Sequence, residues 1–180
     1  MTGRAGAAMG AADGQSLAAL VEHGGVHREV GGESMKEVVS AIIGLLPPVP
    51  ALDREKLRRE ILEREALIST GVGRGIALPH PRSPMLAGGS AEAPMVAIAF
   101  PAQPVDWNTQ DGSKVRTVFL IISSSVRQHL GTLSKINFLC QQEKFYALIE
   151  RRAPREEIIA AIGEAEAAWA QRHGGNLQAL

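Results

Sequence analysis

One stretch of sequence decides how the chain is interpreted, namely Ser69-Thr70-Gly71-Val72-Gly73-Arg74-Gly75-Ile76-Ala77-Leu78-Pro79-His80. It predicts a glycine-rich loop over residues 69–75 and then a brief strand at residues 76–78, which ends at Pro79-His80-Pro81. Prolines fix φ and remove backbone donors, so a histidine between two prolines is held stiffly. Reactive groups often sit in loops on a rigid scaffold. His80 is therefore a candidate functional residue, and the alternative is a histidine that only occupies a surface turn.

Strands and helices alternate on both sides of this stretch. Hydrophobic periodicity, the N-cap residue Asp53 and the capping box from Ser125 to Gln128 give their order. We expect a helical turn near residues 17–21, a strand at 26–30, helices at 35–46 and 53–65, strands at 76–78, 96–100 and 115–123, a loop at 83–94, and helices from 125 and from 154. This alternation indicates one α/β layered domain over residues 16–172. Flexible tails are expected at residues 1–15 and 173–180.

Composition excludes several classes of protein. The 180 residues contain 19 basic and 19 acidic side chains, and this balance argues against a nucleic-acid binder. Apolar residues make up 45% of the chain, enough for an ordinary core, but the longest apolar runs are far too short to span a bilayer. The single Cys140 excludes an intramolecular disulfide framework and a cysteine-rich metal site. We therefore expect a soluble, cytoplasmic protein that is not inserted in a membrane.

Common catalytic motifs are missing. The run Gly71–Gly75 is neither a dinucleotide-binding GxGxxG nor a phosphate loop that ends in Gly-Lys-Ser/Thr. The sequence contains no HExxH, CxxC or GxSxG motif. The carboxylates are scattered over predicted helix surfaces, where solvation explains them better than paired acid–base work.

Two further residues are candidates beside His80. His129 lies in the early turns of the helix that starts at Ser125, and the alternative is a half-buried histidine that is merely hydrogen-bonded. Arg64 follows Leu57 and Ile61 on the same predicted helix stripe. The alternative for this arginine is a side chain that snorkels at the edge of the stripe.

Together these residues resemble a known family. Arg64-Glu65 followed by residues 69–80 is similar to the active-site segment of the type-2 IIA domains of the phosphotransferase system, the fructose/mannitol and nitrogen-regulatory class. The segment Pro104–Trp107 with Asp111-Gly112 resembles that family's middle segment, and His129-Leu130 resembles the start of its second-histidine helix. The resemblance extends from about Leu17 to Ile162.

The resemblance implies a fold and a site. The family fold is a mixed central sheet of about five strands, flanked by helices on both faces. His80 would accept a phosphoryl group from the carrier HPr, or from its nitrogen-type counterpart, and form a phosphohistidine intermediate. Arg64 and His129 would line the phosphoryl pocket, and Ser69 and Thr70 would lie beside it. No metal or other cofactor is implied, because transfer between two imidazoles needs a neutral ring nitrogen, which histidine provides near its ordinary pKa of about 6.5.

Three functions remain open. The first is a phosphorelay within sugar uptake that passes the group to a IIB domain. The second is a regulatory module whose phosphorylation state controls a kinase or transporter, and we favour it because no IIB or IIC sequence is attached. The third is a scaffold that has lost phosphotransfer. Pro81 stands where the family commonly has glycine and offers no N–H to a phosphoryl oxygen, which bears on donor docking or transfer rate and also favours the regulatory module.

Overall fold

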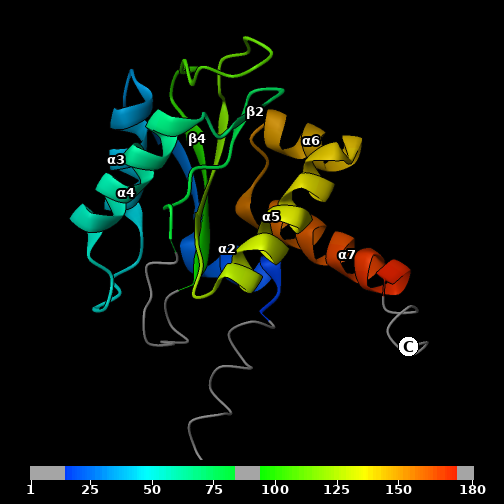
Figure 1. Cartoon of the computed structure of the whole chain (residues 1–180). Coiled ribbons are helices and arrows are strands. Elements are labelled where there is room, and N and C mark those ends of the chain that lie inside the picture. Colours follow the sequence, from blue (N-terminus) through cyan, green and yellow to red (C-terminus); the bar gives the residue numbers. More distant parts are fainter. Residues whose placement is uncertain (1–14, 84–93, 174–180) are drawn as a thin grey trace, which may run out of the picture.

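A five-stranded mixed sheet forms the centre of the protein, as the computed structural model shows for residues 15–83 and 94–173 (Figure 1). The strands are β1 (Val26–Val30), β2 (Gly71–Gly73), β3 (Ile76–Ala77), β4 (Met95–Pro101) and β5 (Thr117–Ile122). Their order across the sheet is β1-β4-β5-β3-β2. The β1–β4 and β3–β5 pairs are parallel, whereas β4–β5 and β2–β3 are antiparallel. The predicted fold class is confirmed.

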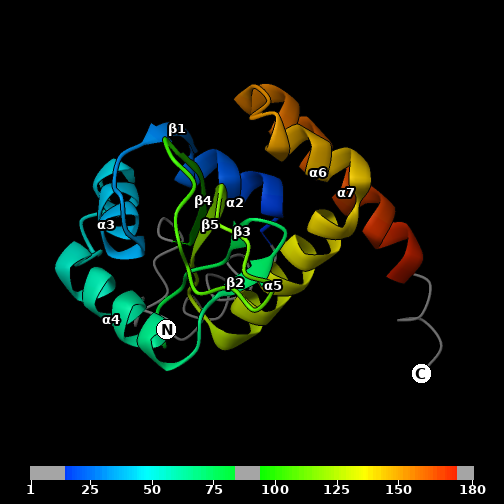
Figure 2. The same cartoon turned by 90° about the horizontal axis from the view of Figure 1, so that it is seen from above.

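Helices cover both faces of this sheet (Figure 2). One face carries α3 (Met35–Leu45) and α4 (Arg54–Leu67). The other face carries α2 (Leu17–Gly24), α5 (Val126–Gln141), α6 (Glu143–Glu150) and α7 (Arg155–His173). Successive side chains of a strand point to opposite faces, so each central strand supplies two cores. In β5, Leu120 joins the core under α3 and α4, whereas Phe119 and Ile121 join the core under the other four helices.

Side chains cap the helices where the sequence predicts that they begin. The Asp53 carboxylate accepts a hydrogen bond from the Lys56 N–H at 3.0 Å. The Ser125 hydroxyl accepts one from the Gln128 N–H at 3.1 Å. Each cap satisfies a backbone donor that has no partner within its own helix. The cap at Ser125 fixes the start of α5, the helix that carries His129.

Three details differ from the expectations. Residues 71–73, expected in a loop, form β2, because the turn after them returns the chain antiparallel along β3. The helix from Ser125 is expected through Cys140, with helical propensity to about Arg152; the structure ends α5 at Gln141 and forms a separate helix, α6, after it. In α4 the buried residue that follows Leu57 and Ile61 is Glu65, since the buried stripe advances in steps of four, and Arg64 lies at its edge. The predicted tails at 1–15 and 173–180 and the predicted loop at 83–94 fall almost wholly outside the described residues.

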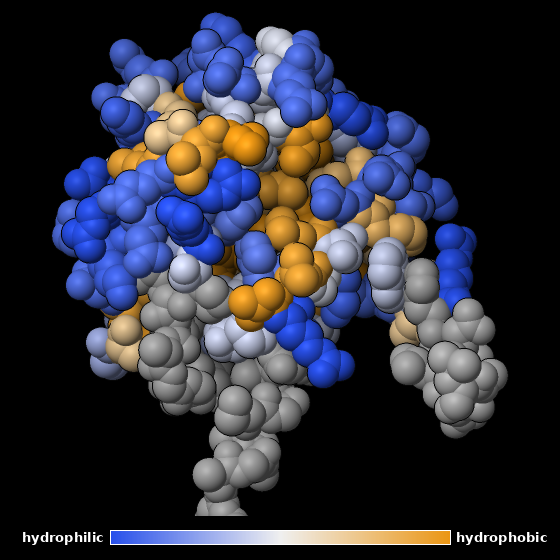
Figure 3. Space-filling model, in the orientation of Figure 1, coloured by the Kyte–Doolittle hydropathy of each residue, from blue (hydrophilic) through white to orange (hydrophobic). Residues whose placement is uncertain are grey.

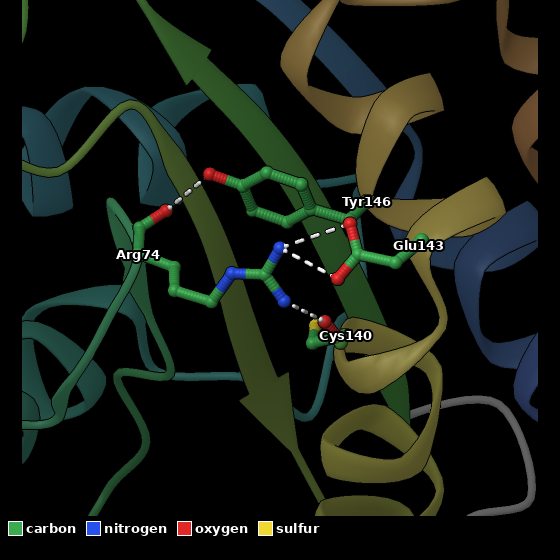
Figure 4. A network of polar contacts seen from close by, with 4 residues as sticks. All are labelled: Arg74, Cys140, Glu143 and Tyr146. Carbon is green, nitrogen blue, oxygen red and sulfur yellow. Dashed lines mark hydrogen bonds and ion pairs between the residues drawn. The ribbon is translucent and has the colours of Figure 1, made fainter.

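Arg74 fixes the β2–β3 turn against the helical layer (Figure 4). Its guanidinium lies 3.8 Å from the centre of the Tyr146 ring, pairs with Glu143 at 3.1 Å and donates to the Cys140 carbonyl at 3.4 Å. The Tyr146 hydroxyl in turn donates to the Arg74 carbonyl at 3.0 Å. These contacts hold the start of β3, the strand that leads to His80.

No helix among residues 15–83 and 94–173 is long and apolar enough to cross a membrane.

Candidate functional site

The parallel pairing of β3 and β5 brings His80 and His129 together. Parallel strands end at the same edge of a sheet. His80 follows the end of β3, and His129 lies in the early turns of α5, which begins shortly after β5 at the lower end of the sheet in Figure 1. The centres of the two rings are 4.6 Å apart, with their planes tilted by 52°. Two residues that are distant in the sequence thus form one site.

Main-chain contacts fix the orientation of the His80 ring. Its Nδ1 lies 2.8 Å from the Leu78 carbonyl oxygen, which can only accept a hydrogen bond. Nδ1 therefore carries the proton, and the lone pair of the neutral ring lies on Nε2. The Pro79 carbonyl accepts a hydrogen bond from the Ile121 N–H at 3.0 Å, so the backbone just before His80 is tied to β5.

Burial keeps both imidazoles neutral near pH 7. The pKa of His80 is lowered below its ordinary value, mainly by burial; the Leu78 hydrogen bond opposes this effect and the charge of Arg64 adds to it. Burial, helped by the neighbouring His80 ring and by Arg64, lowers the pKa of His129 to about 4. A charged imidazolium has no lone pair to offer, so these shifts preserve the nucleophilic form of His80.

The charge of Arg64 contributes to lowering the pKa of both His80 and His129, so its guanidinium lies within electrostatic reach of both rings. Its Nη1 donates to the Ile68 carbonyl at 2.7 Å, which holds the guanidinium at the carboxyl end of α4. A guanidinium has five N–H donors, so one backbone contact leaves several for a ligand. The arrangement places a fixed positive charge near a site where an anion could bind.

The hydroxyls of Ser69 and Thr70 are engaged within the protein. Ser69 Oγ donates to the Trp107 carbonyl at 2.6 Å. The N–H and the hydroxyl of Thr70 both donate to the Glu65 carboxylate, the N–H at 3.0 Å. Both residues precede β2, the strand that pairs with β3, and both hydroxyls donate within the protein. Sequence reasoning gave Glu65 no role, although its position four residues after Ile61 was a signal that it is buried.

A pocket of about 120 Å³ opens beside His129. It is lined by Pro81, Arg82, Ser83, Ile121, Ser123, Val126 and His129. The positive end of the α5 dipole lies at this pocket and favours an anion there. Ser123 Oγ lies 3.5 Å from His129 Nδ1, a long contact that leaves the opposite nitrogen of that ring available.

Exposed apolar side chains flank the two ends of the site. Leu67 and Ile68 follow Arg64 and are 65% and 68% exposed, while Val126 and Leu130 lie on either side of His129 and are 63% and 58% exposed. Figure 3 shows apolar surface gathered across the face between α4 and α5. Exposed apolar surface that gathers beside polar residues is typical of a surface that docks another protein, and these four side chains are called the apolar rim of the site.

Among the residues that the structure describes, no three His, Cys, Asp or Glu side chains are grouped so as to hold a metal ion.

Comparisons with known proteins agree on one family. Residues 20–165 match the family model of the "Phosphoenolpyruvate-dependent sugar phosphotransferase system, EIIA 2". A nitrogen regulatory protein of Pseudomonas aeruginosa is 34% identical over 136 residues, covering 74% of this chain and 84% of that protein. A fructose-specific EIIABC component of Bacillus subtilis is 28% identical over 132 residues, covering 72% of this chain but only 20% of that protein.

Solved structures share the fold. The nitrogen regulatory protein IIA-Ntr from Neisseria meningitidis superposes with a TM-score of 0.67 at 23% identity, covering 77% of this chain and 93% of that one. The mannitol enzyme IIA of Escherichia coli, solved in complex with its phosphorylated enzyme IIB, superposes with a TM-score of 0.59 at 13% identity and covers 78% of this chain and 95% of that one.

Proposed function

Because the chain belongs to the EIIA 2 family of the phosphoenolpyruvate-dependent sugar phosphotransferase system, we propose that it is a phosphohistidine carrier in which His80 Nε2 accepts the phosphoryl group. The observation that carries this proposal is the hydrogen bond from His80 Nδ1 to the Leu78 carbonyl, beside a second ring 4.6 Å away. It leaves the lone pair of a neutral imidazole on Nε2, which is the form that attacks phosphorus.

The transfer step needs no proton movement at His80. The Nε2 lone pair forms a bond to the phosphorus of a donor phosphohistidine, while the phosphorus–nitrogen bond of the donor breaks and its electron pair returns to the donor ring. His80 keeps its proton on Nδ1 throughout. Such phosphoryl transfer has a loose transition state, so the protein contributes positioning and charge stabilisation.

In this proposal, two neighbours stabilise the transferred charge. Arg64 contributes planar N–H donors to the phosphoryl oxygens. His129 contributes one hydrogen bond from its outward nitrogen, aided by the positive end of α5. Ser69 and Thr70 would act indirectly, because their hydroxyls already donate to the Trp107 carbonyl and to the Glu65 carboxylate.

For the biological role we favour a cytoplasmic regulatory protein of the nitrogen-regulatory type. Its donor would be HPr or a nitrogen-type HPr, which would dock on the apolar rim of Leu67, Ile68, Val126 and Leu130, and its target a regulated kinase or transporter. The support is that the match to the Pseudomonas nitrogen regulatory protein extends over 84% of that protein. We expect neither nucleic-acid binding nor membrane insertion.

A sugar-uptake role is the second candidate. The fructose-specific relative favours it, as does the mannitol IIA structure with its phosphorylated IIB partner. Here His80 would pass the group to a separate IIB domain of a fructose/mannitol-type permease. A third possibility, a scaffold that is not phosphorylated, draws only on Pro81, which withholds the backbone N–H that a glycine would offer there.

Phosphorylation in vitro tests these alternatives. The protein is incubated with phosphoenolpyruvate, enzyme I and either HPr or nitrogen-type HPr, and acid-labile phosphate is measured. We expect labelling of the wild type and of His23→Ala, a matched histidine on α2, but none of His80→Ala. Labelling that persists in His80→Ala would refute the assignment. Onward transfer to a IIB domain would favour sugar uptake, and no labelling by either donor would favour the scaffold.

A further inference from the structure

A chain of hydrogen bonds connects α4 to the reactive ring. Both oxygens of the Glu65 carboxylate accept from Thr70, one from its N–H at 3.0 Å and the other from its hydroxyl. The Thr70 carbonyl accepts from the Leu78 N–H at 3.1 Å. The Leu78 carbonyl accepts from His80 Nδ1 at 2.8 Å. Three links thus connect the four residues, from a helix through two strand ends to the imidazole.

Glu65, the first residue of this chain of hydrogen bonds, is buried, and both of its carboxylate oxygens accept a hydrogen bond. Glu65 is 7% exposed and Thr70 is 6% exposed. A buried carboxylate is stable only where hydrogen bonds or opposite charges compensate for its lost hydration. Thr70 provides that compensation with two donors, so the position of Glu65 on α4 determines where Thr70 can lie. A docked protein partner could not reach a carboxylate at this depth.

The last member of the chain decides the chemistry. A neutral imidazole can carry its proton on either nitrogen, and the partner of one nitrogen determines which form is present. If the Leu78 carbonyl moves, the proton of His80 is no longer held on Nδ1, and the ring can exchange between its two neutral tautomers. The charge of Glu65 also reaches His80, because it raises the pKa of that ring in opposition to Arg64.

We propose that Glu65 is a positioning residue for phosphoryl transfer, acting through Thr70 and the Leu78 carbonyl to hold the proton of His80 on Nδ1 and present Nε2 to the donor. The proposal rests on the proposed function of His80. Glu65 touches neither the donor nor the phosphoryl group. Its effect therefore belongs to the transfer step and not to donor binding.

Three substitutions separate this role from general stability. Glu65→Ala removes both acceptors. Glu65→Gln keeps the shape, and its amide can accept from the Thr70 N–H while donating to the Thr70 hydroxyl. Thr70→Val removes only the hydroxyl. Glu63→Gln, an exposed glutamate on the same helix, is the matched control.

The first readout is the tautomer of His80, from ¹H–¹⁵N long-range correlation spectra of histidine-labelled protein. We expect the Nδ1–H form in the wild type, Glu63→Gln and Glu65→Gln, and a mixture of the two forms in Glu65→Ala. The second readout is the rate of phosphoryl transfer from phosphorylated nitrogen-type HPr. We expect kcat to fall about 100-fold in Glu65→Ala, a loss typical of a reacting group displaced by about 1 Å, with KM for the donor unchanged and with recovery in Glu65→Gln.

A folded Glu65→Ala variant that keeps the wild-type tautomer and kcat would overturn the proposal. So would a variant whose only change is a higher KM for the donor. If Glu65→Ala does not fold, Thr70→Val carries the test: a mixed tautomer and a fall in kcat of about tenfold are expected, and wild-type values for both would overturn it. Failure of the proposed function has a different signature. The wild type would then take up no phosphate, while the spectra would still report how Glu65 controls the His80 tautomer.

Discussion

Replacing His129 by glutamine should make the folded protein less sensitive to acid. The pKa of His129 is lowered to about 4, first by burial and then by the His80 ring and Arg64. The folded ring therefore takes up a proton only below about pH 4, whereas the ring of the unfolded chain takes one up below its ordinary value of 6.5. Between these values the unfolded chain binds more protons, so the free energy of unfolding decreases as the pH falls.

The size of this effect follows from the same two values. The difference between 6.5 and about 4 corresponds to about 3 kcal/mol in the free energy of unfolding. The ring is only partly buried, and solvent screens its charge, so we expect about 1–2 kcal/mol. The loss begins below the unfolded value and is complete once the pH has fallen past about 4. Part of it should diminish with added salt, because the charge of Arg64 contributes.

Urea unfolding followed by circular dichroism measures this directly. The free energy of unfolding is determined at about pH 7.5 and about pH 4.5 for the wild type and for His129→Gln, so that carboxylates titrating in this range cancel in the comparison. We expect the wild type to lose about 1–2 kcal/mol more than the variant. Equal losses in the two proteins would refute the reasoning. An NMR titration of the wild type should place the midpoint of His129 well below that of an ordinary histidine.

Three further substitutions test other parts of the structure. Arg64→Ala should lower the rate of His80 phosphorylation about 10- to 100-fold, since one charge-stabilising donor is lost, and should change the thermal midpoint little; an unchanged rate in the phosphorylation assay would argue against a role for Arg64 in the pocket. Pro81→Gly should raise that rate up to about tenfold, because it restores a backbone N–H that can donate to a phosphoryl oxygen; a slower variant would contradict this role. Gly24→Ala should lower the free energy of unfolding, measured in urea, by about 1–3 kcal/mol, because the added Cβ would lie 2.3 Å from the Val96 carbonyl oxygen. An unchanged free energy of unfolding would show that α2 can shift on β4.

Periodicity and capping residues were enough to predict most of the fold. Asp53 and Ser125 each begin a helix where a side-chain acceptor can reach a free backbone N–H, a local effect that a sequence reveals. Strand β2 was missed because its three residues contain two glycines and only one apolar side chain. It is a strand because it pairs with β3, and that pairing depends on contacts outside the segment.

The sequence pointed to the two histidines that the structure brings together, but not to the hydrogen bonds around them. His80 and His129 were both named from the sequence, and the parallel pairing of β3 and β5 explains why they meet. The hydrogen bonds of Glu65, Thr70 and Leu78 were not predictable, since they depend on the register between β2 and β3 and on the rotation of α4. If the buried stripe of α4 is taken to continue from Ile61 by three residues, it reaches Arg64; by four residues, it reaches Glu65, which is the residue that the structure buries.

Proline chemistry explains how a short segment can select one nitrogen of an imidazole. A residue that precedes proline is disfavoured in the α region and is driven to extended backbone. Leu78 and His80 each precede a proline, so both are restricted before any tertiary contact forms. The Leu78 carbonyl accepts a hydrogen bond from His80 Nδ1 at 2.8 Å, and the restricted backbones of both residues limit how far this contact can vary. In the proposed function Pro81 would therefore have two opposing effects: it would restrict the backbone of His80 and so help to keep the ring on the Leu78 carbonyl, and it would withhold a donor from the phosphoryl oxygens. Pro81→Gly removes both effects at once, and the faster transfer predicted for it means that the restored donor outweighs the loss of backbone restriction; the His80 tautomer, measured beside the transfer rate, checks this balance.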